Sequence, residues 1–381
     1  MRSAIRCKSL ALSLLLALPF PHATQAYPDT AAGTLAAGYS HAAALKSNGS
    51  VWSWGSNTLG NGTINSSTTP VQATGLTGVV AINSGTSYSI ALKSDGTLRA
   101  WGSNSYGQLG DGTTTLRTTP VTGLWTNSVA IATSDTDGIT LAVKSDRTVW
   151  SAGNNNWGTL GDGTMVNRST PVQVTGLTNV LNVAIGSYHA LAVKLDGTVW
   201  TWGTEMSGEF GDGGTSNSVQ LTPIQVPGLT NVVAVSAGYL SSYALKSDGS
   251  VWAWGMNAHG QLGLGSAYSS SSVPMQIVGL AGITAIAAGW YHATALKSDG
   301  TVSAWGSNIY GGLGDGTVTQ RYTPVQVSGL SNVVAISNGY QFSMAKTSNG
   351  AVKTWGYNNY GQLGDGTTIT RLTPVSVVGL P

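Results

Sequence analysis

A Trp-Gly pair recurs in phase six times in the 381-residue sequence, 47 to 52 residues apart where copies are adjacent, and this repeat restricts the possible folds more than any other feature. Ala152-Gly153 occupies the one missing place, which brings the number of copies to seven. A proline and a Gly-Leu pair recur in phase with it. Periods of about 20–50 residues are typical of solenoids and propellers. The pairs begin at Trp54, Trp101, Trp202, Trp254, Trp305 and Trp355.

Each copy predicts a four-stranded antiparallel sheet. Two extended runs flank an Asp-Gly or Asn-Gly pair such as Asp95-Gly96, and this pattern predicts a two-residue hairpin with a type I′ turn. Asp146-Arg147 departs from the pattern, so we expect strain or a different turn there. One run precedes this hairpin, and another follows a Thr-Pro step, where proline suits an outer strand. No copy has a ten-residue stretch of helical period.

Seven such sheets predict a closed ring, because a single sheet of this size buries too little surface to be stable alone. We therefore expect an all-β, seven-bladed propeller of four-stranded antiparallel blades over residues 34–381, after a short linker at 27–33. The strand near 374–378 is expected to complete the first blade, so that N- and C-terminal strands share a blade and close the ring. An open solenoid is the alternative, and it would need polar capping repeats.

The N-terminus predicts export. Three cations precede an apolar run of 11 residues, and small residues at Thr24 and Ala26 precede Tyr27, so residues 1–26 are predicted to be a signal peptide. The apolar run is shorter than the roughly 20 residues that a membrane span needs. We expect a secreted, periplasmic or cell-surface protein without a membrane span. The only cysteine, Cys7, lies in the leader, so the mature chain has no disulfides.

The charge balance argues against nucleic acid as a partner. Removal of the leader takes three of the 17 basic residues and none of the 15 acidic ones, which leaves a formal charge of −1. Proteins that bind DNA through its phosphates typically use about 6–10 cationic contacts. The sequence has no basic cluster that could supply them. Trp and β-branched residues are abundant, so the chain is expected to fold despite its few charges.

The sixth copy resembles the repeat of the regulator of chromosome condensation family. The resemblance rests on Gly289-Trp290-Tyr291-His292, Trp305-Gly306-Ser307-Asn308 and Gly311-Gly312-Leu313-Gly314, and it covers the chain from about residue 31 to the end. It implies a seven-bladed propeller whose terminal segments share a blade.

Two kinds of function follow from that resemblance. Eukaryotic members of the family exchange nucleotide on a small nuclear GTPase and bind chromatin. Other members are binding platforms, including secreted bacterial propellers that inhibit β-lactamases. The predicted export makes this chain similar to the secreted bacterial type, and guanine-nucleotide exchange is the alternative. None of the exchange factor's functional residues can be placed on this sequence.

Aromatic residues collect in the two sets of loops predicted to lie opposite the Asp-Gly hairpins. Residues after the first loop's glycine differ between copies, whereas positions that solve the same packing problem should stay alike. This variation among large aromatics favours a surface that binds a protein or a cell-envelope glycan. The alternative is that the rings fill the funnel around the channel. The candidates are Tyr39, Tyr188, Tyr239, Trp290, Tyr291, Tyr340, Trp157, Tyr310 and Tyr360.

Other polar residues have structural interpretations. His41, His189 and His292 recur in phase at a strand start, so we expect structural hydrogen bonds rather than catalysis. The recurring Gly-Asp-Gly-Thr segments predict turns. Asp135 and Asp137 are weak candidates for a calcium site, because the full loop that such sites need is absent.

One pair of residues suggests an enzyme. Glu205 and Glu209, the only glutamates, share a loop in the fourth copy. If they faced each other across a cleft, they could act as acid and base in glycan cleavage. No other pairing of a nucleophile with a base is present, so the main expectation is a non-enzymatic monomer without a cofactor.

Overall fold

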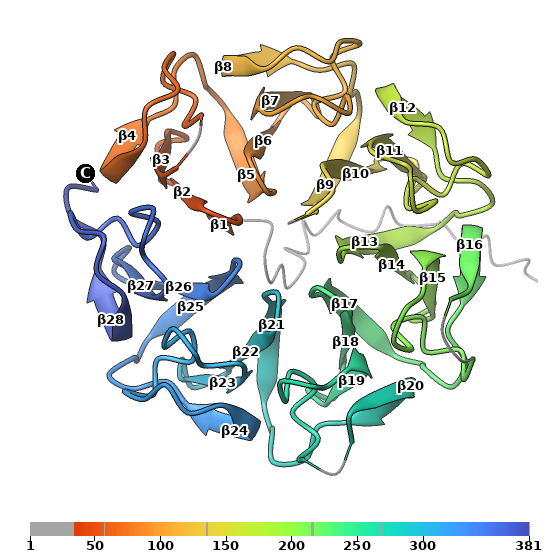
Figure 1. Cartoon of the computed structure of the whole chain (residues 1–381). Coiled ribbons are helices and arrows are strands. Elements are labelled where there is room, and N and C mark those ends of the chain that lie inside the picture. Colours follow the sequence, from red (N-terminus) through yellow and green to blue (C-terminus); the bar gives the residue numbers. More distant parts are fainter. Residues whose placement is uncertain (1–33, 57, 135, 215–216, 267, 381) are drawn as a thin grey trace, which may run out of the picture.

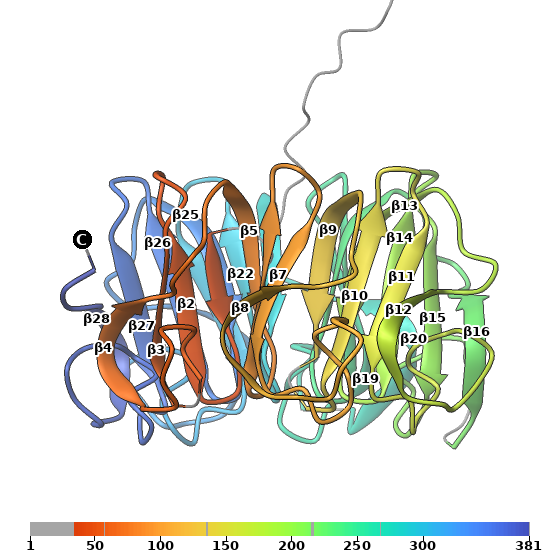
Figure 2. The same cartoon turned by 90° about the horizontal axis from the view of Figure 1, so that it is seen from above.

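The computed structural model describes residues 34–56, 58–134, 136–214, 217–266 and 268–380. Seven sheets surround a central axis like the blades of a propeller (Figure 1). Each sheet has four antiparallel strands, which run roughly along that axis (Figure 2). These residues form no helix. The predicted all-β, seven-bladed propeller is therefore confirmed, while the predicted leader and linker lie outside the described residues.

The strands follow one another blade by blade. Blades 1 to 3 comprise β1 (Leu35–Ala37), β2 (His41–Leu45), β3 (Val51–Gly55), β4 (Ser67–Gln72); β5 (Val79–Ser84), β6 (Tyr88–Lys93), β7 (Leu98–Gly102), β8 (Arg117–Thr122); and β9 (Ser128–Thr133), β10 (Ile139–Lys144), β11 (Val149–Gly153), β12 (Arg168–Gln173). Blades 4 and 5 comprise β13 (Val180–Ile185), β14 (His189–Lys194), β15 (Val199–Thr204), β16 (Val219–Gln225); and β17 (Val232–Ala237), β18 (Ser241–Lys246), β19 (Val251–Met256), β20 (Ser270–Gln276). Blades 6 and 7 comprise β21 (Ile283–Ala288), β22 (His292–Lys297), β23 (Val302–Gly306), β24 (Arg321–Gln326); and β25 (Val333–Asn338), β26 (Phe342–Thr347), β27 (Val352–Gly356), β28 (Arg371–Ser376).

Burial falls from the inner strands to the outer ones. The second strand of each blade is almost wholly buried, as in β14, because neighbouring blades cover both of its faces. The fourth strand is half-exposed, and its proline, such as Pro171 in β12, lies at the outer edge where no further strand needs an N–H donor. Each hydrophobic cluster combines residues of two adjacent blades, for example Leu141 of β10 with Ile185 and Trp202 of the next blade. The core is therefore a ring of interfaces.

The hairpin between the second and third strands differs from the prediction. Lys93 and Thr97 close the loop, because the Lys93 N–H donates to the Thr97 carbonyl and the Gly96 N–H donates to the Lys93 carbonyl, both at 2.9 Å. Three residues thus lie in the loop, and only Gly96 among them has a positive φ, of 77°. This is a three-residue loop with a glycine bulge, so the predicted two-residue type I′ turn is wrong. Arg147 makes the same turn with a φ of 66°, which is strained for a residue with a side chain.

The ring closes without a shared blade. The first sheet contains β1 to β4 and the last contains β25 to β28, so every blade is built from consecutive strands and the predicted sharing of terminal strands is wrong. Closure relies on contacts between the loops and side chains of blades 7 and 1, including a backbone bond from the Gly366 N–H to the Thr68 carbonyl at 3.0 Å. The Trp54 indole donates to the Gln362 carbonyl at 2.9 Å, and the Ala37 N–H donates to Ser337 Oγ at 3.1 Å. Lys346 Nζ also donates to the Leu45 carbonyl, at 3.4 Å.

The hydrogen bond from the Trp54 indole to a backbone carbonyl of the neighbouring blade recurs at other interfaces between blades. In five blades the indole of the Trp-Gly pair donates to a backbone carbonyl of the preceding blade at 2.8–2.9 Å, from Trp54, Trp202, Trp254, Trp305 and Trp355. The interface between blades 7 and 1 therefore contains the same tryptophan contact as the interfaces between blades that follow one another in the sequence.

Blade 3 replaces its missing tryptophan from another part of the chain. Ala152 leaves space at its interface with blade 2, and Trp125, from the connection between β8 and β9, fills it. The Trp125 indole donates to the Leu109 carbonyl at 3.0 Å. A Cβ atom on Gly110 would lie 2.3 Å from Trp125 Nε1, just as a Cβ on Gly161 would lie 2.8 Å from Trp202 Nε1. Trp125 therefore occupies the place of the regular tryptophan.

Candidate functional site: an aromatic mouth

Two sets of loops meet at one end of the propeller, opposite the Asp-Gly hairpins. The loops between first and second strands surround the channel and bond to one another from blade to blade. The Tyr239 N–H donates to the Trp290 carbonyl, and the Ser187 N–H to the Tyr239 carbonyl, both at 3.2 Å. The loops between third and fourth strands lie outside them, and Thr204 Oγ1 donates to the Trp157 carbonyl of the neighbouring blade at 2.9 Å. The expected grouping of these loops at one end is confirmed.

The glycine of each Trp-Gly pair allows the third strand to approach the inner loop closely. A Cβ atom on Gly203, the glycine of a Trp-Gly pair, would lie 2.3 Å from the carbonyl oxygen of Tyr188 in the inner loop. A Cβ atom on Gly306 would likewise lie 2.4 Å from the carbonyl oxygen of Tyr291. The repeated glycine thus brings the third strand against the inner loop and fixes where the aromatic side chain begins.

Aromatic side chains from six blades form one connected group around the propeller axis at this end. We call seven of them the aromatic mouth: Tyr39, Trp157, Tyr188, Tyr239, Trp290, Tyr291 and Tyr340. Tyr39 stacks on Tyr340 with ring centroids 4.3 Å apart, and Trp290 meets both edge-on, at 5.3 and 4.6 Å. Tyr239 joins Trp290 to Tyr188, at 5.1 and 5.8 Å. Trp157 and Tyr291 complete the chain of contacts at 4.9 and 5.4 Å.

The aromatic mouth is both packed and exposed. All seven side chains are half-buried, so each ring presents one part to its neighbours and another to solvent. Blade 2 contributes Thr86 and Ser87 instead of an aromatic residue, which interrupts the arc of rings on that side. The sequence left two alternatives: rings that fill the centre of the propeller, and rings exposed on a binding surface. Each alternative describes these residues in part.

The tyrosine hydroxyls of the mouth are coupled in pairs. The pKa of Tyr188 is raised because its hydroxyl bonds that of Tyr239 and because it is partly buried. Burial and the neighbouring Tyr340 raise the pKa of Tyr39 to about 12. Both hydroxyls are therefore neutral at physiological pH and can donate or accept hydrogen bonds at the rim.

The remaining predicted residues belong to an outer group. Tyr310 and Tyr360 are exposed, and both contact the ring of Tyr357, at 4.7 and 6.0 Å. Tyr357 in turn reaches Tyr340 at 6.3 Å, and so connects this group to the mouth. Sequence reasoning missed Tyr357, although it stands where other copies have serine, as at Ser103 and Ser307. All nine predicted candidates are thus brought together, and their role in binding stays a prediction.

The three repeated histidines have a structural role, as expected. His41, His189 and His292 are buried, and each Nε2 hydrogen-bonds a serine hydroxyl of the next blade at 2.8–2.9 Å. The serine then donates to the preceding blade's loop, as Ser242 Oγ does to the Glu209 carbonyl at 2.8 Å. Burial lowers the pKa of His41 and His292 to about 4 and that of His189 to about 3. These side chains are neutral links between blades.

The two glutamates are buried and hold their own loop together. Glu205 takes the place of an asparagine such as Asn104 in other copies, and Glu209 the place of a glutamine such as Gln108. Glu209 accepts the N–H groups of Met206 and Ser207 at 2.7 and 2.6 Å. Their exposed fractions are 1% and 0%, so they do not face each other across an open cleft, as the hypothesis of an enzyme requires. Neither carboxylate faces a cleft that could admit a glycan.

Burial also changes the ionisation of this loop. It raises the pKa of Glu209 to about 7, helped by the charge of Glu205, whose own pKa is raised by burial. Because the folded pKa of Glu209 exceeds its unfolded value near 4.5, the fold favours the protonated acid. Its contribution to stability therefore falls as the pH rises from about 4.5 to about 7.

The aspartates of the Gly-Asp-Gly-Thr segments make turns, as predicted. Asp111 Oδ1 accepts the Thr113 N–H and hydroxyl at 3.0 and 2.7 Å, and its other oxygen pairs with Arg117 at 2.7 Å. Blades 3, 6 and 7 repeat the ion pair.

Asp135 and Asp137 are the weak candidates for calcium ligands. Asp137 is half-buried, and burial raises its pKa to about 6. Asp135 lies outside the described residues. Within the described ranges, no group of three or more His, Cys, Asp or Glu side chains could hold a metal ion.

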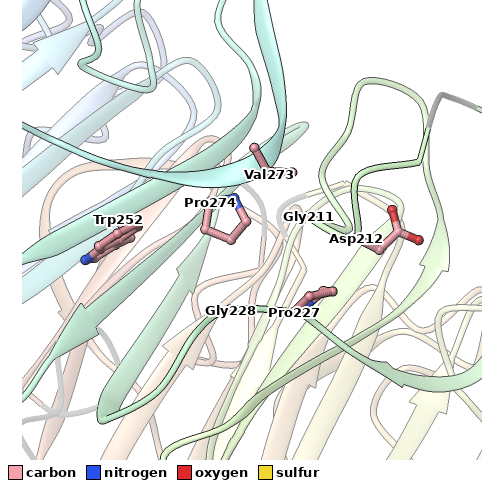
Figure 3. Close-up of a pocket in the computed structure, with 7 residues that line it drawn as sticks. All are labelled: Gly211, Asp212, Pro227, Gly228, Trp252, Val273 and Pro274. Atoms are coloured by element: carbon pink, nitrogen blue, oxygen red, sulfur yellow. The ribbon is translucent and has the colours of Figure 1, made fainter.

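A groove also opens on the flank between blades 4 and 5 (Figure 3). It has a volume of about 230 Å³ and is lined by Gly211, Asp212, Pro227, Gly228, Trp252, Val273 and Pro274. Asp212 is the single titratable group in this lining, so the groove offers no acid–base pair.

A closed seven-bladed ring with Trp-Gly contacts between blades and a loop-built aromatic end defines a propeller of the chromosome-condensation-regulator type. The chain belongs to the RCC1-like domain family, whose pattern matches residues 137–381. Regulator of chromosome condensation (RCC1) repeats also match within residues 34–132. The resemblance found in the sequence is therefore confirmed.

Curated relatives share only part of their length with this chain. The ultraviolet-B receptor UVR8 of Arabidopsis thaliana is 32% identical over 187 residues, 48% of this chain and 42% of the receptor. The human probable E3 ubiquitin-protein ligase HERC4 is 40% identical over 189 residues, 48% of this chain and 18% of the ligase. The chain spans less than half the length of these relatives.

Solved structures share the fold. Yeast RCC1 (Prp20), bound to Kap60, superposes with a TM-score of 0.80 at 19% identity, covering 100% of this chain and 91% of that one. Human WBSCR16 gives a TM-score of 0.73 at 24% identity, covering 82% and 85%. Among the described residues, no helix is long and apolar enough to cross a membrane.

Proposed function

We propose that this chain is an exported propeller that captures another protein through the aromatic mouth. The observation that carries the proposal is the continuous group of half-exposed rings from six blades, at positions where the copies differ. Tyr and Trp side chains act as rigid anchors in interfaces, each worth roughly 2 kcal/mol or more at hot spots. A leader at residues 1–26 supports export.

The relatives support a binding role. The solved Prp20p structure is described together with its binding to Gsp1p and histones, and another structure has the yeast protein bound to Kap60. Guanine-nucleotide exchange remains the alternative by resemblance, but export would separate this chain from a cytosolic GTPase. This chain matches only 18% of the length of the probable ligase HERC4. The ligase activity named for HERC4 therefore gives no support for an enzymatic function of this chain.

A glycan is the second candidate ligand, because the exposed ring faces of the mouth could stack on sugar rings. The two candidates predict different behaviour. A protein partner should be retained when soluble envelope sugars are added in excess, whereas a glycan ligand should be displaced.

The test is capture of the partner from the source's envelope and culture fluid by the purified chain. Trp290→Ala and Tyr239→Ala should each weaken capture roughly 30-fold, in line with about 2 kcal/mol per anchor, while thermal unfolding changes little. Tyr322→Ala, an exposed aromatic on β24 outside the mouth, is the matched control and should bind normally. Capture that survives both mouth variants would refute the proposal, and unfolding of both would show that the rings are core.

A further inference from the structure

The two ends of the propeller carry opposite charge. The hairpin end has ten cations and five anions in the described residues, a formal charge of +5: Lys46, Lys93, Arg99, Lys144, Arg147, Lys194, Lys246, Lys297, Lys346 and Lys353 with Asp95, Asp146, Asp196, Asp248 and Asp299. The mouth end has four cations and eight anions, a formal charge of −4: Arg117, Arg168, Arg321 and Arg371 with Asp111, Asp137, Asp162, Glu205, Glu209, Asp212, Asp315 and Asp365. The near-neutral total hides this separation.

The cations at the mouth end are already paired. Each of the four arginines lies on the outer rim and contacts the aspartate of its own turn at 2.7–2.8 Å. The inner loops that carry the mouth contain no lysine or arginine in any blade. A ligand above the rings would therefore meet no unpaired positive charge from these loops.

One carboxylate stands beside the rings. Asp137 lies in the inner loop of blade 3, next to blade 4, where Thr136 Oγ1 donates to the Ser187 carbonyl at 3.5 Å. Its charge acts on Tyr188 of the mouth. The Asp137 Oδ2 atom is buried and has no hydrogen-bond donor among the described residues. A buried carboxylate oxygen without a donor is a costly arrangement that a cationic ligand would relieve.

Tryptophans elsewhere in the same chain show how such rings are used when a cation is near. At the hairpin end Lys144 Nζ lies 3.6 Å from the ring centre of Trp150, and Lys246 Nζ lies 4.4 Å from that of Trp252. Those rings are covered by lysines of their own blade. The mouth rings instead contact one another and leave part of their surface to solvent.

We propose that the aromatic mouth accepts a lysine- or arginine-bearing segment of the partner protein, with the cation over the mouth rings and countered by Asp137. The inference rests on the proposed function and specifies the partner's chemistry. A ring face attracts a cation through its quadrupole, and tryptophan does so best. The negative field of this end would also speed the approach of a basic segment and repel an acidic one.

The test uses acetylated tetra-arginine amide and the matching tetra-citrulline amide, which has nearly the same shape without the charge. Calorimetric titration of the mature chain should show the arginine peptide binding at least tenfold more tightly, with a strong loss on raising the salt. Trp290→Ala and Asp137→Asn should each weaken the arginine peptide about five- to tenfold. Asp248→Asn, at the hairpin end, is the matched control and should leave its binding unchanged.

Three results would overturn the inference: equal binding of the two peptides, binding of neither, or an effect of Asp248→Asn as large as that of Asp137→Asn. Thermal unfolding of each variant shows whether it is folded. The outcome is separable from that of the proposed function. If the natural partner is still lost on Trp290→Ala while the two peptides bind alike, the mouth binds its partner without a cation.

Discussion

Lowering the pH from 7 to 4 is expected to lower the free energy of unfolding of this protein by roughly 6 kcal/mol. His41, His189 and His292 are buried and neutral, with folded pKa values of about 3 to 4 against an unfolded value near 6.5. The fold therefore favours the neutral imidazole, and its contribution is complete above about pH 6.5 and lost progressively below it. At pH 4 each histidine accounts for about 3 kcal/mol. Glu209 acts in the opposite direction and recovers about 3 kcal/mol over the same range.

Denaturant unfolding at pH 7.5, 6, 5 and 4 measures this dependence. His292→Phe should reduce the net change by about half, because it removes one of the three histidine contributions of about 3 kcal/mol. Phe342 already occupies the equivalent buried place in blade 7, so a phenylalanine fits there. At pH 7.5, where the wild-type histidine is neutral in both states, the variant should differ little from wild type apart from its lost hydrogen bond to Ser343. A wild-type free energy of unfolding that is constant between pH 7 and 4 would contradict the burial of neutral histidines.

Trp125→Ala is expected to destabilise the propeller by about 4 kcal/mol, the cost typical of removing a buried tryptophan. The indole is 1% exposed and packs with Leu109, Ile131 and Ala142 between blades 2 and 3. Its loss would leave a cavity at one interface and remove the hydrogen bond to the Leu109 carbonyl. Denaturant unfolding of the variant measures the loss.

A second substitution tests whether Trp125 occupies the place of the tryptophan that is missing at Ala152. The double variant Trp125→Leu with Ala152→Trp restores the arrangement of the next two interfaces. There the buried Leu177 and Leu229 stand directly before a Thr-Asn pair, as Trp125 does, and pack with Trp202 and Trp254. It should recover most of the lost stability. If Ala152→Trp lowers stability further in the Trp125→Leu background, Trp125 does not substitute for the regular tryptophan.

The blades could be predicted from the repeat because every copy solves the same packing problem, so that in-phase residues such as Trp202 and Trp254 have the same environment. The hairpin geometry could not, because Asp-Gly suits both two-residue loops and the three-residue loop that Gly96 forms. The prediction that the terminal strands share a blade was wrong for a related reason. The positions of the chain ends do not reveal whether a terminal strand joins its neighbour's sheet or packs beside it.

Residues that depart from the repeat were harder to interpret. Trp125 lies outside the phase of the Trp-Gly pairs, so alignment of copies alone does not connect it with Ala152. The burial of Glu205 and Glu209 could have been expected, because they are in phase with the buried Asn104 and Gln108. Their loop position does not make them surface residues, because these loops pack against the next blade and their polar side chains bond their own backbone.

The aromatic end could be predicted in its composition and location, but not in its contacts. Topology alone places the inner and outer loops together, whereas the stacking of Tyr39 on Tyr340 depends on side-chain directions across the first and last blades. Tyr357 shows the same limit. It belongs to a serine position in the repeat and enters the aromatic group only because its ring reaches Tyr340.

Hydrogen–deuterium exchange on the captured complex tests most directly whether the partner occupies the aromatic mouth. Occupation of the mouth predicts slower exchange in the inner loops at residues 38–40, 186–188, 238–240, 289–291 and 339–341, and unchanged exchange in the hairpins at residues 94–96, 195–197 and 247–249. Protection confined to the hairpins, with the inner loops unchanged, would contradict it.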